Sequence, residues 1–405
     1  MPAASFFVSL DTGCVPGASR PVPIARLRFD GTAFETLPVE GADKEALGLV
    51  NPLGSLQTPP AAALLTDSLP DTWASRVLRM LLAARARRFE TRPEPADEAL
   101  LLASICDDTR LGALRISCGP APNEFLSVRI HNLPRTEHLT ELAATARRIE
   151  AGDIIAVSLL EPFVQSALAL GGSRPKASFA GEDGRLWIAK FPSREDERDK
   201  GAWEACVTNL ARAAGIRTSP CLLTDVSEAR GRVFCVPRFD RTPEGGRLHY
   251  LSLKALLGAH ANREAHAYRD VVRLIDAICF DPVREKEELF ARTVFKCLVH
   301  DGDDHLRNQG FLLTERGWEL SPAFDLNASA SRTRMTLTYG AGRRELSVPA
   351  VLEECTDWDL TPERARAIAD SVADAVKNWQ DEAARLCISE SEIDAMRPAF
   401  AFGPF

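Results

Sequence analysis

An acidic loop between an apolar helix and a hairpin constrains the fold of this chain more than any other segment. Residues 294–299 form an apolar run that predicts a buried helix, and residues 300–310 follow as His-Asp-Gly-Asp-Asp-His-Leu-Arg-Asn-Gln-Gly. Two strand-like segments between 311 and 320 then flank a turn and lead into Asp325. Because a hairpin brings its two ends together, we expect Asp325 to lie near Asn308.

Within this loop, Asp303 and Asn308 form an Asp-x-x-x-x-Asn pair. Phosphoryl transfer needs a carboxylate that orients an attacking hydroxyl and accepts its proton, and an amide oxygen that helps to hold magnesium on the phosphates. Asp325 is the second predicted magnesium ligand, because magnesium commonly takes one or two carboxylates plus substrate phosphates. The alternative is a capped turn without chemistry; an EF-hand would need a glutamate at its twelfth position, which is missing here.

A glycine-rich loop precedes a predicted strand upstream. Residues 171–176 read Gly-Gly-Ser-Arg-Pro-Lys, and glycines permit a tight loop whose N–H groups approach phosphate oxygens. Gly172, Ser173 and Lys176 are therefore candidate nucleotide contacts. The sequence is not a Walker A motif, and a plain turn is the alternative.

Two charged residues beyond this loop suit a nucleotide site. Lys190 ends an alternating strand, where kinases place the lysine that holds the α- and β-phosphates. Glu204 lies on the next predicted helix and would pair with Lys190 as the helix glutamate of kinases does. The alternatives are a solvated lysine and a surface charge.

The apolar strand at residues 233–237 ends in a polar cluster. In a two-lobed kinase, backbone groups at this point would face adenine, and Asp240 would bind the ribose hydroxyls. Arg238 and Asp240 would alternatively form an ion pair that joins two lobes.

The composition is that of a globular protein. The chain has 405 residues, of which 45% are hydrophobic, enough for a sizeable core in two or three lobes. A net charge of -8 argues against a chain whose main task is to coat nucleic acid. A predicted helix carries an arginine-rich face from residue 76 to 92. This face is either simply solvated or makes a local contact with nucleic acid or an acidic partner. Without a spanning apolar run, a secretory signal or any Cys-x-x-Cys among its ten cysteines, the chain is expected in the reducing cytoplasm.

The order of patterns predicts an α+β fold. The first ~120 residues mix strands and helices, with a hairpin turn at Asp30-Gly31. Residues 178–237 alternate strands with one helix, and beyond residue 251 the chain is mostly helical, apart from one strand pair near 309–320. A strand-rich lobe followed by a helical lobe suits a two-lobed nucleotide-binding enzyme.

The order of these motifs resembles the HipA family of bacterial toxin kinases. The resemblance rests on residues 171–176, Lys190, residues 238–241, 303–308 and 321–326, and extends to residues 68–73, 107–114 and 357–379. It implies a protein-kinase-like fold of three parts. These are a HipA-like N-terminal subdomain (1–148), the ATP-binding part of the N-terminal lobe (149–250), and a helical C-terminal lobe with the catalytic loop (251–405).

The resemblance also implies a function. HipA-like kinases transfer the γ-phosphate of ATP, with Mg²⁺, to a serine or threonine of a translation component, often an aminoacyl-tRNA synthetase. They are the toxins of toxin–antitoxin pairs, neutralised by a small helix-turn-helix antitoxin of HipB type that also binds DNA. Asp303 matches the catalytic aspartate, Asn308 and Asp325 the metal ligands, and Lys190 the phosphate contact. Phe239 and Asp240 match the adenine and ribose contacts.

Two positions depart from the family pattern. Ala169 stands where the family has a serine that it phosphorylates on itself, so Ser166 or Ser173 would have to replace it. Pro237 stands at an often acidic position and has no N–H to offer adenine. A kinase for a small hydroxyl-bearing molecule, or a catalytically weak scaffold for an antitoxin–DNA complex, are the alternative functions.

Overall fold

The computed structural model describes residues 4–54, 60–119, 125–126, 133–226, 231–257 and 266–401. The chain divides into two compact units. Unit 1 comprises Met1–Asp196 and Asp225–Leu251, and unit 2 comprises Glu197–Thr224 and Ser252–Phe405. The domain boundaries expected at residues 148 and 250 stay a prediction.

Unit 1 begins with an antiparallel sheet of strand order β3-β2-β1-β4. Its strands are β1 (Ala4–Leu10), β2 (Val22–Phe29), β3 (Phe34–Leu37) and β4 (Leu114–Ser117). The predicted hairpin is confirmed between β2 and β3, because Asp30 Oδ1 accepts hydrogen bonds from the N–H groups of Thr32 and Ala33 at 2.8 and 3.0 Å. Helices α1 (Lys44–Val50), α2 (Ala61–Leu65) and α4 (Glu98–Ser104) accompany this sheet, and its own apolar core includes Leu47, Leu64 and Leu102.

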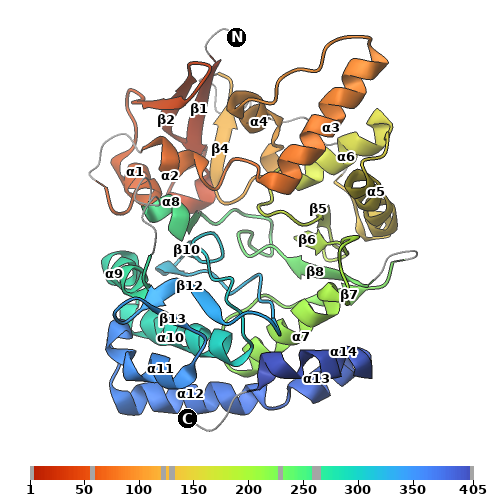
Figure 1. The fold of residues 1–405 in the computed structure, drawn as a ribbon. Coiled ribbons are helices and arrows are strands. Elements are labelled where there is room, and N and C mark those ends of the chain that lie inside the picture. The colour runs from red at the N-terminus through yellow and green to blue at the C-terminus, as the bar shows by residue number, and fades with distance from the viewer. Residues whose placement is uncertain are drawn as a thin grey trace. The chain divides into compact units, whose positions relative to one another are not determined.

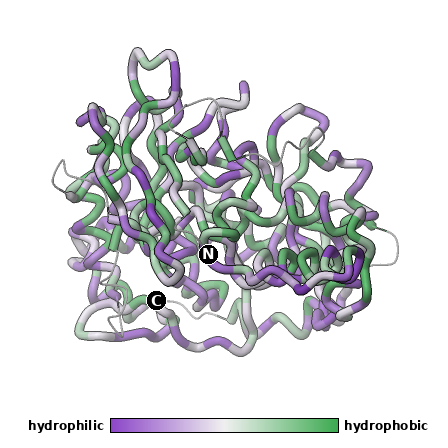
Figure 2. Tube along the Cα trace, turned by 90° about the horizontal axis from the view of Figure 1, so that it is seen from above, coloured by the Kyte–Doolittle hydropathy of each residue, from purple (hydrophilic) through white to green (hydrophobic). Residues whose placement is uncertain are grey.

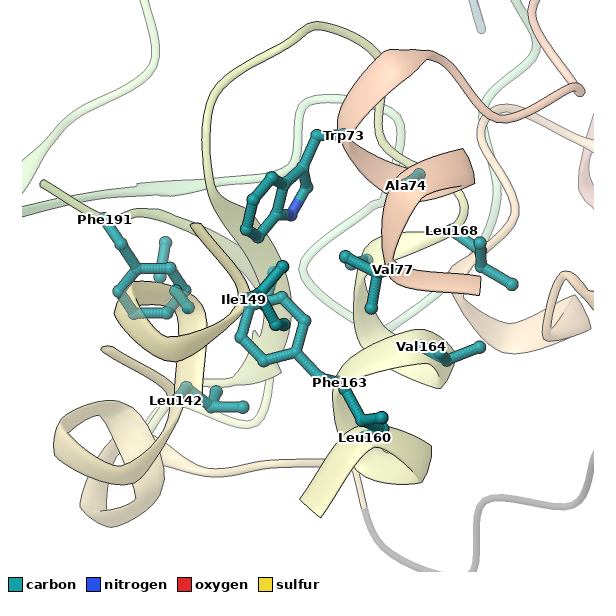
Figure 3. Close-up of a cluster of buried hydrophobic side chains, with 14 of the residues drawn as sticks. Trp73, Ala74, Val77, Leu142, Ile149, Leu160, Phe163, Val164, Leu168 and Phe191 are labelled. Carbon is teal, nitrogen blue, oxygen red and sulfur yellow. The ribbon is translucent and has the colours of Figure 1, made fainter. Parts of the chain in front are cut away.

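A second antiparallel sheet in unit 1 contains β5 (Lys176–Ala180), β6 (Leu186–Lys190) and β8 (Val233–Pro237). Helices α3 (Thr72–Arg88), α5 (Leu139–Ala151) and α6 (Val157–Ala167) lie beside it (Figure 1). Their apolar faces share one core with the sheet, in which Trp73 of α3, Phe163 of α6 and Phe191 after β6 pack together (Figure 3). The rings of Trp73 and Phe163 meet edge to face, with centroids 6.0 Å apart.

Unit 2 is mostly helical, as predicted. Its helices are α7 (Lys200–Ala213), α8 (Leu253–Leu257), α9 (Tyr268–Ile278), α10 (Pro282–Leu298), α11 (Val348–Glu353), α12 (Pro362–Val376), α13 (Trp379–Arg385) and α14 (Glu390–Met396). Strand β7 (Leu222–Thr224) also belongs to it, and β9 (Tyr250–Ser252) crosses the boundary with unit 1. The predicted hairpin is present as β10 (Gly310–Thr314) and β11 (Gly317–Leu320).

The expectation of a single strand pair in this part of the chain was wrong. Strands β12 (Arg334–Tyr339) and β13 (Arg343–Glu345) form a second antiparallel pair, and β12 lies near α9 (Figure 1). Met335, Leu337 and Tyr339 are buried on one face of β12, while Arg334 and Thr336 on the other face are exposed and only Thr338 at its end is buried. This alternation is the normal signature of a half-buried strand.

Hydrophobic and hydrophilic residues alternate along the trace (Figure 2). Among the described residues, no helix combines the length and the apolar character that crossing a membrane would need.

The ten cysteines are free thiols. Several are buried, and burial raises the pKa of Cys206 to about 12, so this thiol behaves as a small apolar side chain.

Candidate active site in two parts

The acidic loop of unit 2 begins where α10 ends. His300 reverses the chain in a left-handed backbone conformation, with φ of 50°, which is uncommon outside glycine. The loop then places Asp303 and Asn308 together, because Asn308 Nδ2 donates a hydrogen bond to the carbonyl oxygen of Asp303 at 2.8 Å. The side chain of Asp303 is 42% exposed, so it is accessible from solvent. The predicted base therefore lies at the surface of unit 2, with its amide partner fixed beside it.

A buried ion pair supports this loop from beneath. Lys296 Nζ lies 3.0 Å from Asp301 Oδ2, and the other oxygen of Asp301 accepts a hydrogen bond from the backbone N–H of Asp303 at 3.2 Å. Burial alone would lower the pKa of Lys296, but the carboxylates of Asp301, Asp304 and Asp325 around it raise that pKa above its ordinary value. Lys296 is therefore a fixed positive charge under the loop.

Asp304 has a structural role. Its carboxylate is fully buried and accepts hydrogen bonds from Tyr268 Oη at 2.6 Å, from the N–H of Thr336 at 2.7 Å and from the N–H of Leu337 at 3.2 Å. A carboxylate with this many donors and no exposed surface cannot receive a proton from an external hydroxyl. Of the two neighbouring aspartates, only Asp303 is open to a substrate.

Asp325 follows β11 in the same unit and is partly exposed. Its φ of 57° is again left-handed, a strained conformation that is frequent at functional sites. Burial raises the pKa of Asp301, and the charge of Asp325 raises it further; the same charge adds to those that raise the pKa of Lys296. Asn308 and Phe324 line one small cavity of about 10 Å³. The residues just before the β10–β11 hairpin and those just after it therefore lie close together.

The oxygen donors here suit magnesium. The amide nitrogen of Asn308 is committed to Asp303, and in the described part of the chain its Oδ1 accepts no hydrogen bond, which leaves that oxygen for a cation. Asp325 adds a carboxylate. No cluster of three or more His, Cys, Asp or Glu side chains among the described residues could hold a metal. Asn308 Oδ1 and the Asp325 carboxylate are oxygen donors of the kind that magnesium takes when phosphates supply its other ligands, and that they hold magnesium stays a prediction.

The predicted phosphate contacts lie in unit 1. Lys176 and Lys190 stand directly opposite each other on β5 and β6, and opposite residues of an antiparallel pair share one face of the sheet. Gly172 has φ of 94°, and a Cβ added there would lie 2.6 Å from Lys176 Nζ, so Lys176 folds back over the glycine loop. Ser173 is exposed in that loop. The loop is tied to α3 by the N–H of Gly172, which donates to Asp71 Oδ2 at 3.2 Å.

Asp240 is fully buried in unit 1. Its carboxylate accepts hydrogen bonds from Arg238 Nη2 at 2.6 Å, Arg241 Nη1 at 2.7 Å and the N–H of Gly112 at 2.6 Å. Burial would raise the pKa of Asp240, but the two guanidinium groups hold it well below its ordinary range. The structure thus shows the ion pair that the sequence left as the alternative, within unit 1. The ribose contact stays a prediction.

Phe239 is partly exposed next to this ion pair. Its ring packs against Tyr250, with centroids 5.4 Å apart. The strand before it ends as predicted at Pro237, and the next N–H, that of Arg238, donates to the carbonyl oxygen of Leu186 at 2.9 Å. Neither Pro237 nor Arg238 therefore offers a free N–H at the end of this strand, and the adenine contact of Phe239 stays a prediction.

The structure separates the two serines that would replace the missing one at Ala169. Ser166 is fully buried in α6, and its hydroxyl donates to the carbonyl oxygen of Pro162 at 2.9 Å. It is closed to modification in this fold. Ser173 is exposed and stays a candidate.

The predicted pair of Lys190 and Glu204 remains untested, because β6 belongs to unit 1 and α7 to unit 2. Glu204 is buried on α7. The same division separates Gly172, Ser173, Lys176, Lys190, Phe239 and Asp240 from Asp303, Asn308 and Asp325.

Comparison with known proteins decides the family. A family model described as the HipA-like C-terminal domain matches residues 168–379. The chain belongs to this family. This HipA-like protein is also 28% identical over 218 residues to "Putative kinase Y4dM" of Sinorhizobium fredii, a match that covers 46% of this chain and 52% of the relative. The chain thus spans about half the length of that relative.

A solved structure shows the fold. The HipA-like chain matches a chain of the Shewanella oneidensis MR-1 toxin–antitoxin complex of HipA, HipB and operator DNA, with a TM-score of 0.58 and 15% identity. That match covers 97% of this chain and 94% of the other. The Helicobacter pylori proinflammatory kinase CtkA matches 57% of this chain and 92% of its own, with a TM-score of 0.41 and 16% identity. The predicted α+β, HipA-like fold is confirmed by the Shewanella structure.

Sequence reasoning missed the residues that hold the acidic loop in the HipA-like protein. Lys296 had a detectable signal, because a lysine inside the apolar run of residues 294–299 implies a buried charge with a partner. Tyr268 and Thr336 had none, since they reach Asp304 from distant parts of the sequence.

Proposed function

We propose that this protein is a protein kinase that uses ATP and Mg²⁺ to phosphorylate serine or threonine. The observation that carries the proposal is the loop geometry of unit 2: an accessible Asp303, held by its backbone to Asn308 at 2.8 Å and to Asp301 at 3.2 Å. Asp303 would orient the acceptor hydroxyl and take its proton, while Asn308 and Asp325 would hold magnesium on the phosphates. Bound magnesium would neutralise charge on the β- and γ-phosphates.

The nucleotide would be held by residues of unit 1. The two ammonium groups of Lys176 and Lys190 lie on one face of the sheet, an arrangement that suits the negative charge of a triphosphate. Gly172 and Ser173 would offer loop groups to phosphate oxygens. Phe239 would stack on adenine. Asp240 would bind the ribose hydroxyls directly, or it would hold the arginines of its ion-paired cluster in place beside the ribose.

Family membership supports a biological role as a toxin. We propose a toxin–antitoxin pair in which the acceptor is a translation component such as an aminoacyl-tRNA synthetase. The partner would be a small helix-turn-helix antitoxin of the HipB type, through which any contact with DNA would be made. The Shewanella chain comes from a complex of HipA, HipB and operator DNA. The place of action would be the cytoplasm.

Transfer of label from [γ-³²P]ATP tests the proposal. The purified protein is added to a clarified lysate of its source cells with magnesium, and in parallel with a chelator. We expect one magnesium-dependent labelled protein band in which acid hydrolysis yields phosphoserine or phosphothreonine. Label confined to small molecules would support a small-molecule kinase instead, and no transfer at all despite ATP binding would support a scaffold.

Asp325 gives a prediction about magnesium. Asp325→Ala removes the carboxylate ligand, so calorimetry should show that ATP affinity no longer increases when magnesium is added, with a loss of about 10-fold or more in the presence of magnesium. Asp359, an exposed aspartate at another left-handed position of the same unit, offers a matched control: Asp359→Ala should leave the affinity unchanged. Equal magnesium-dependent affinity in Asp325→Ala and the wild type would contradict the metal role.

Lys190 gives a prediction about phosphate. Lys190→Met should weaken ATP binding by about 10-fold while adenosine, which has no phosphate, binds as before, because one charge-assisted contact contributes about 1.5 kcal/mol or more. Titration of ATP, ADP and adenosine against both proteins measures this difference. A loss of the same size for adenosine would show that Lys190 supports the fold of the sheet rather than the phosphates.

A further inference from the structure

An arginine from a distant segment reaches the predicted catalytic base. Arg332 Nη1 lies 3.3 Å from Asp303 Oδ1, and the two side chains are 47% and 42% exposed. Arg332 stands between Asp325 and β12, in a part of the chain for which the sequence offered no functional signal. Among the described residues, Arg332 is the cation that forms an ion pair with Asp303.

The backbone of β12 fixes this approach. Thr336 Oγ1 donates to the carbonyl oxygen of Gly302 at 3.1 Å, and the N–H of Thr336 donates to Asp304 at 2.7 Å. A Cβ on Gly302 would lie 2.1 Å from the carbonyl oxygen of Arg334 and 3.4 Å from Cδ of Arg332. The glycine therefore allows the segment that carries Arg332 to lie directly on the catalytic loop.

The ion pair is too weak to keep Asp303 closed. Pairs of side chains as exposed as these bias an equilibrium by a factor of roughly five at most. An autoinhibitory contact would need a far larger bias. Arg332 can therefore leave Asp303 and bind a group that holds it more strongly. A phosphate group is such a partner, because the planar guanidinium group binds phosphate through two parallel hydrogen bonds.

We infer that Arg332 is a further catalytic residue, which contacts the γ-phosphoryl group as it is transferred. The inference rests on the proposed kinase function. In that reaction the acceptor hydroxyl oxygen forms a bond to the γ-phosphorus, and the bond from that phosphorus to the β–γ bridging oxygen breaks. The electron pair of the broken bond leaves with ADP, and the hydroxyl proton passes to the carboxylate of Asp303.

The charge balance of this step explains the need for a cation. The phosphoryl group brings negative charge alongside the carboxylate of Asp303, and catalysis of phosphoryl transfer consists mainly of positioning and of stabilising such charge. Lys296 cannot serve, because it is buried and bound to Asp301. Arg332 is exposed and already in place beside Asp303.

Kinetics of three variants test the inference. Initial rates of transfer to the labelled acceptor are measured at varied ATP for Arg332→Ala, Arg332→Lys and the control Arg334→Ala, whose exposed side chain makes no ion pair in the described part of the chain. We expect kcat of Arg332→Ala to fall about 100-fold with less than about a threefold change in the KM for ATP. Arg332→Lys should recover part of the rate, millimolar guanidinium should raise the rate of Arg332→Ala alone, and Arg334→Ala should match the wild type.

Two outcomes would overturn the inference while leaving the kinase intact. The first is Arg332→Ala at or above the wild-type rate, which would mark Arg332 as neutral or inhibitory. The second is a loss that neither lysine nor guanidinium recovers and that accompanies a lower melting temperature, which would mark a structural role. A wild-type protein without transfer activity would overturn the proposed function, and this inference with it.

Discussion

Replacing Asp303 by asparagine is expected to reduce phosphoryl transfer about 1000-fold while ATP still binds. The substitution keeps the size of the side chain and leaves untouched the two backbone hydrogen bonds that hold the loop, from Asn308 Nδ2 to the carbonyl oxygen and from the N–H of residue 303 to Asp301. It removes the carboxylate that is proposed to accept the hydroxyl proton, and a positioned general base contributes about 10²–10⁴-fold. Single-turnover transfer and calorimetric ATP affinity measure the two quantities separately.

Two controls sharpen this experiment. Asp374→Asn changes an exposed aspartate of α12 and should leave both quantities unchanged. Asp304→Asn should lower the melting temperature, because the buried carboxylate accepts three hydrogen bonds that the amide cannot all accept. Near-wild-type transfer by Asp303→Asn would remove Asp303 from the reaction. Asp304, closed to solvent, would not replace it.

The sequence predicted much of the fold, because the relevant patterns are local. The β2–β3 hairpin follows from Asp30-Gly31, and the β10–β11 hairpin follows from its strand-like flanks and turn. The same locality explains why Asp303 and Asn308 were found together: they lie in one short loop.

The contacts that hold the loop could not be predicted in this way. Asp304 is bound by Tyr268 and by the backbone of β12, and Arg332 reaches Asp303 from the same direction. These contacts depend on how β12 packs, and β12 itself was missed although its apolar residues alternate. Asp240 shows a second limit of prediction from sequence. A carboxylate that follows a strand can bind ribose or form a buried ion pair, and only the surrounding residues, here Arg238, distinguish the two.

Removing the positive charge of Lys296 beneath the acidic loop is expected to destabilise unit 2 strongly. Lys296→Met leaves the carboxylate of Asp301 buried without its partner, and breaking a buried pair on one side costs about 3–5 kcal/mol. For a unit of this size that corresponds to a decrease of roughly 10 °C in Tm, measured by calorimetry. Lys286 on the same helix pairs with two exposed carboxylates, those of Asp276 and Asp359, and offers the matched control. Lys286→Met should cost much less than Lys296→Met, because these carboxylates stay solvated without their partner.

A double variant separates charge from packing at this position. In Lys296→Met with Asp301→Asn, no unpaired charge remains from the pair, and the asparagine oxygen can still accept the hydrogen bond from the N–H of residue 303. We therefore expect the double variant to regain most of the stability that Lys296→Met loses, since apolar replacement of a buried pair is often nearly neutral. If the double variant is as unstable as Lys296→Met, then the alkyl chain of Lys296, rather than its charge on Asp301, supports the loop.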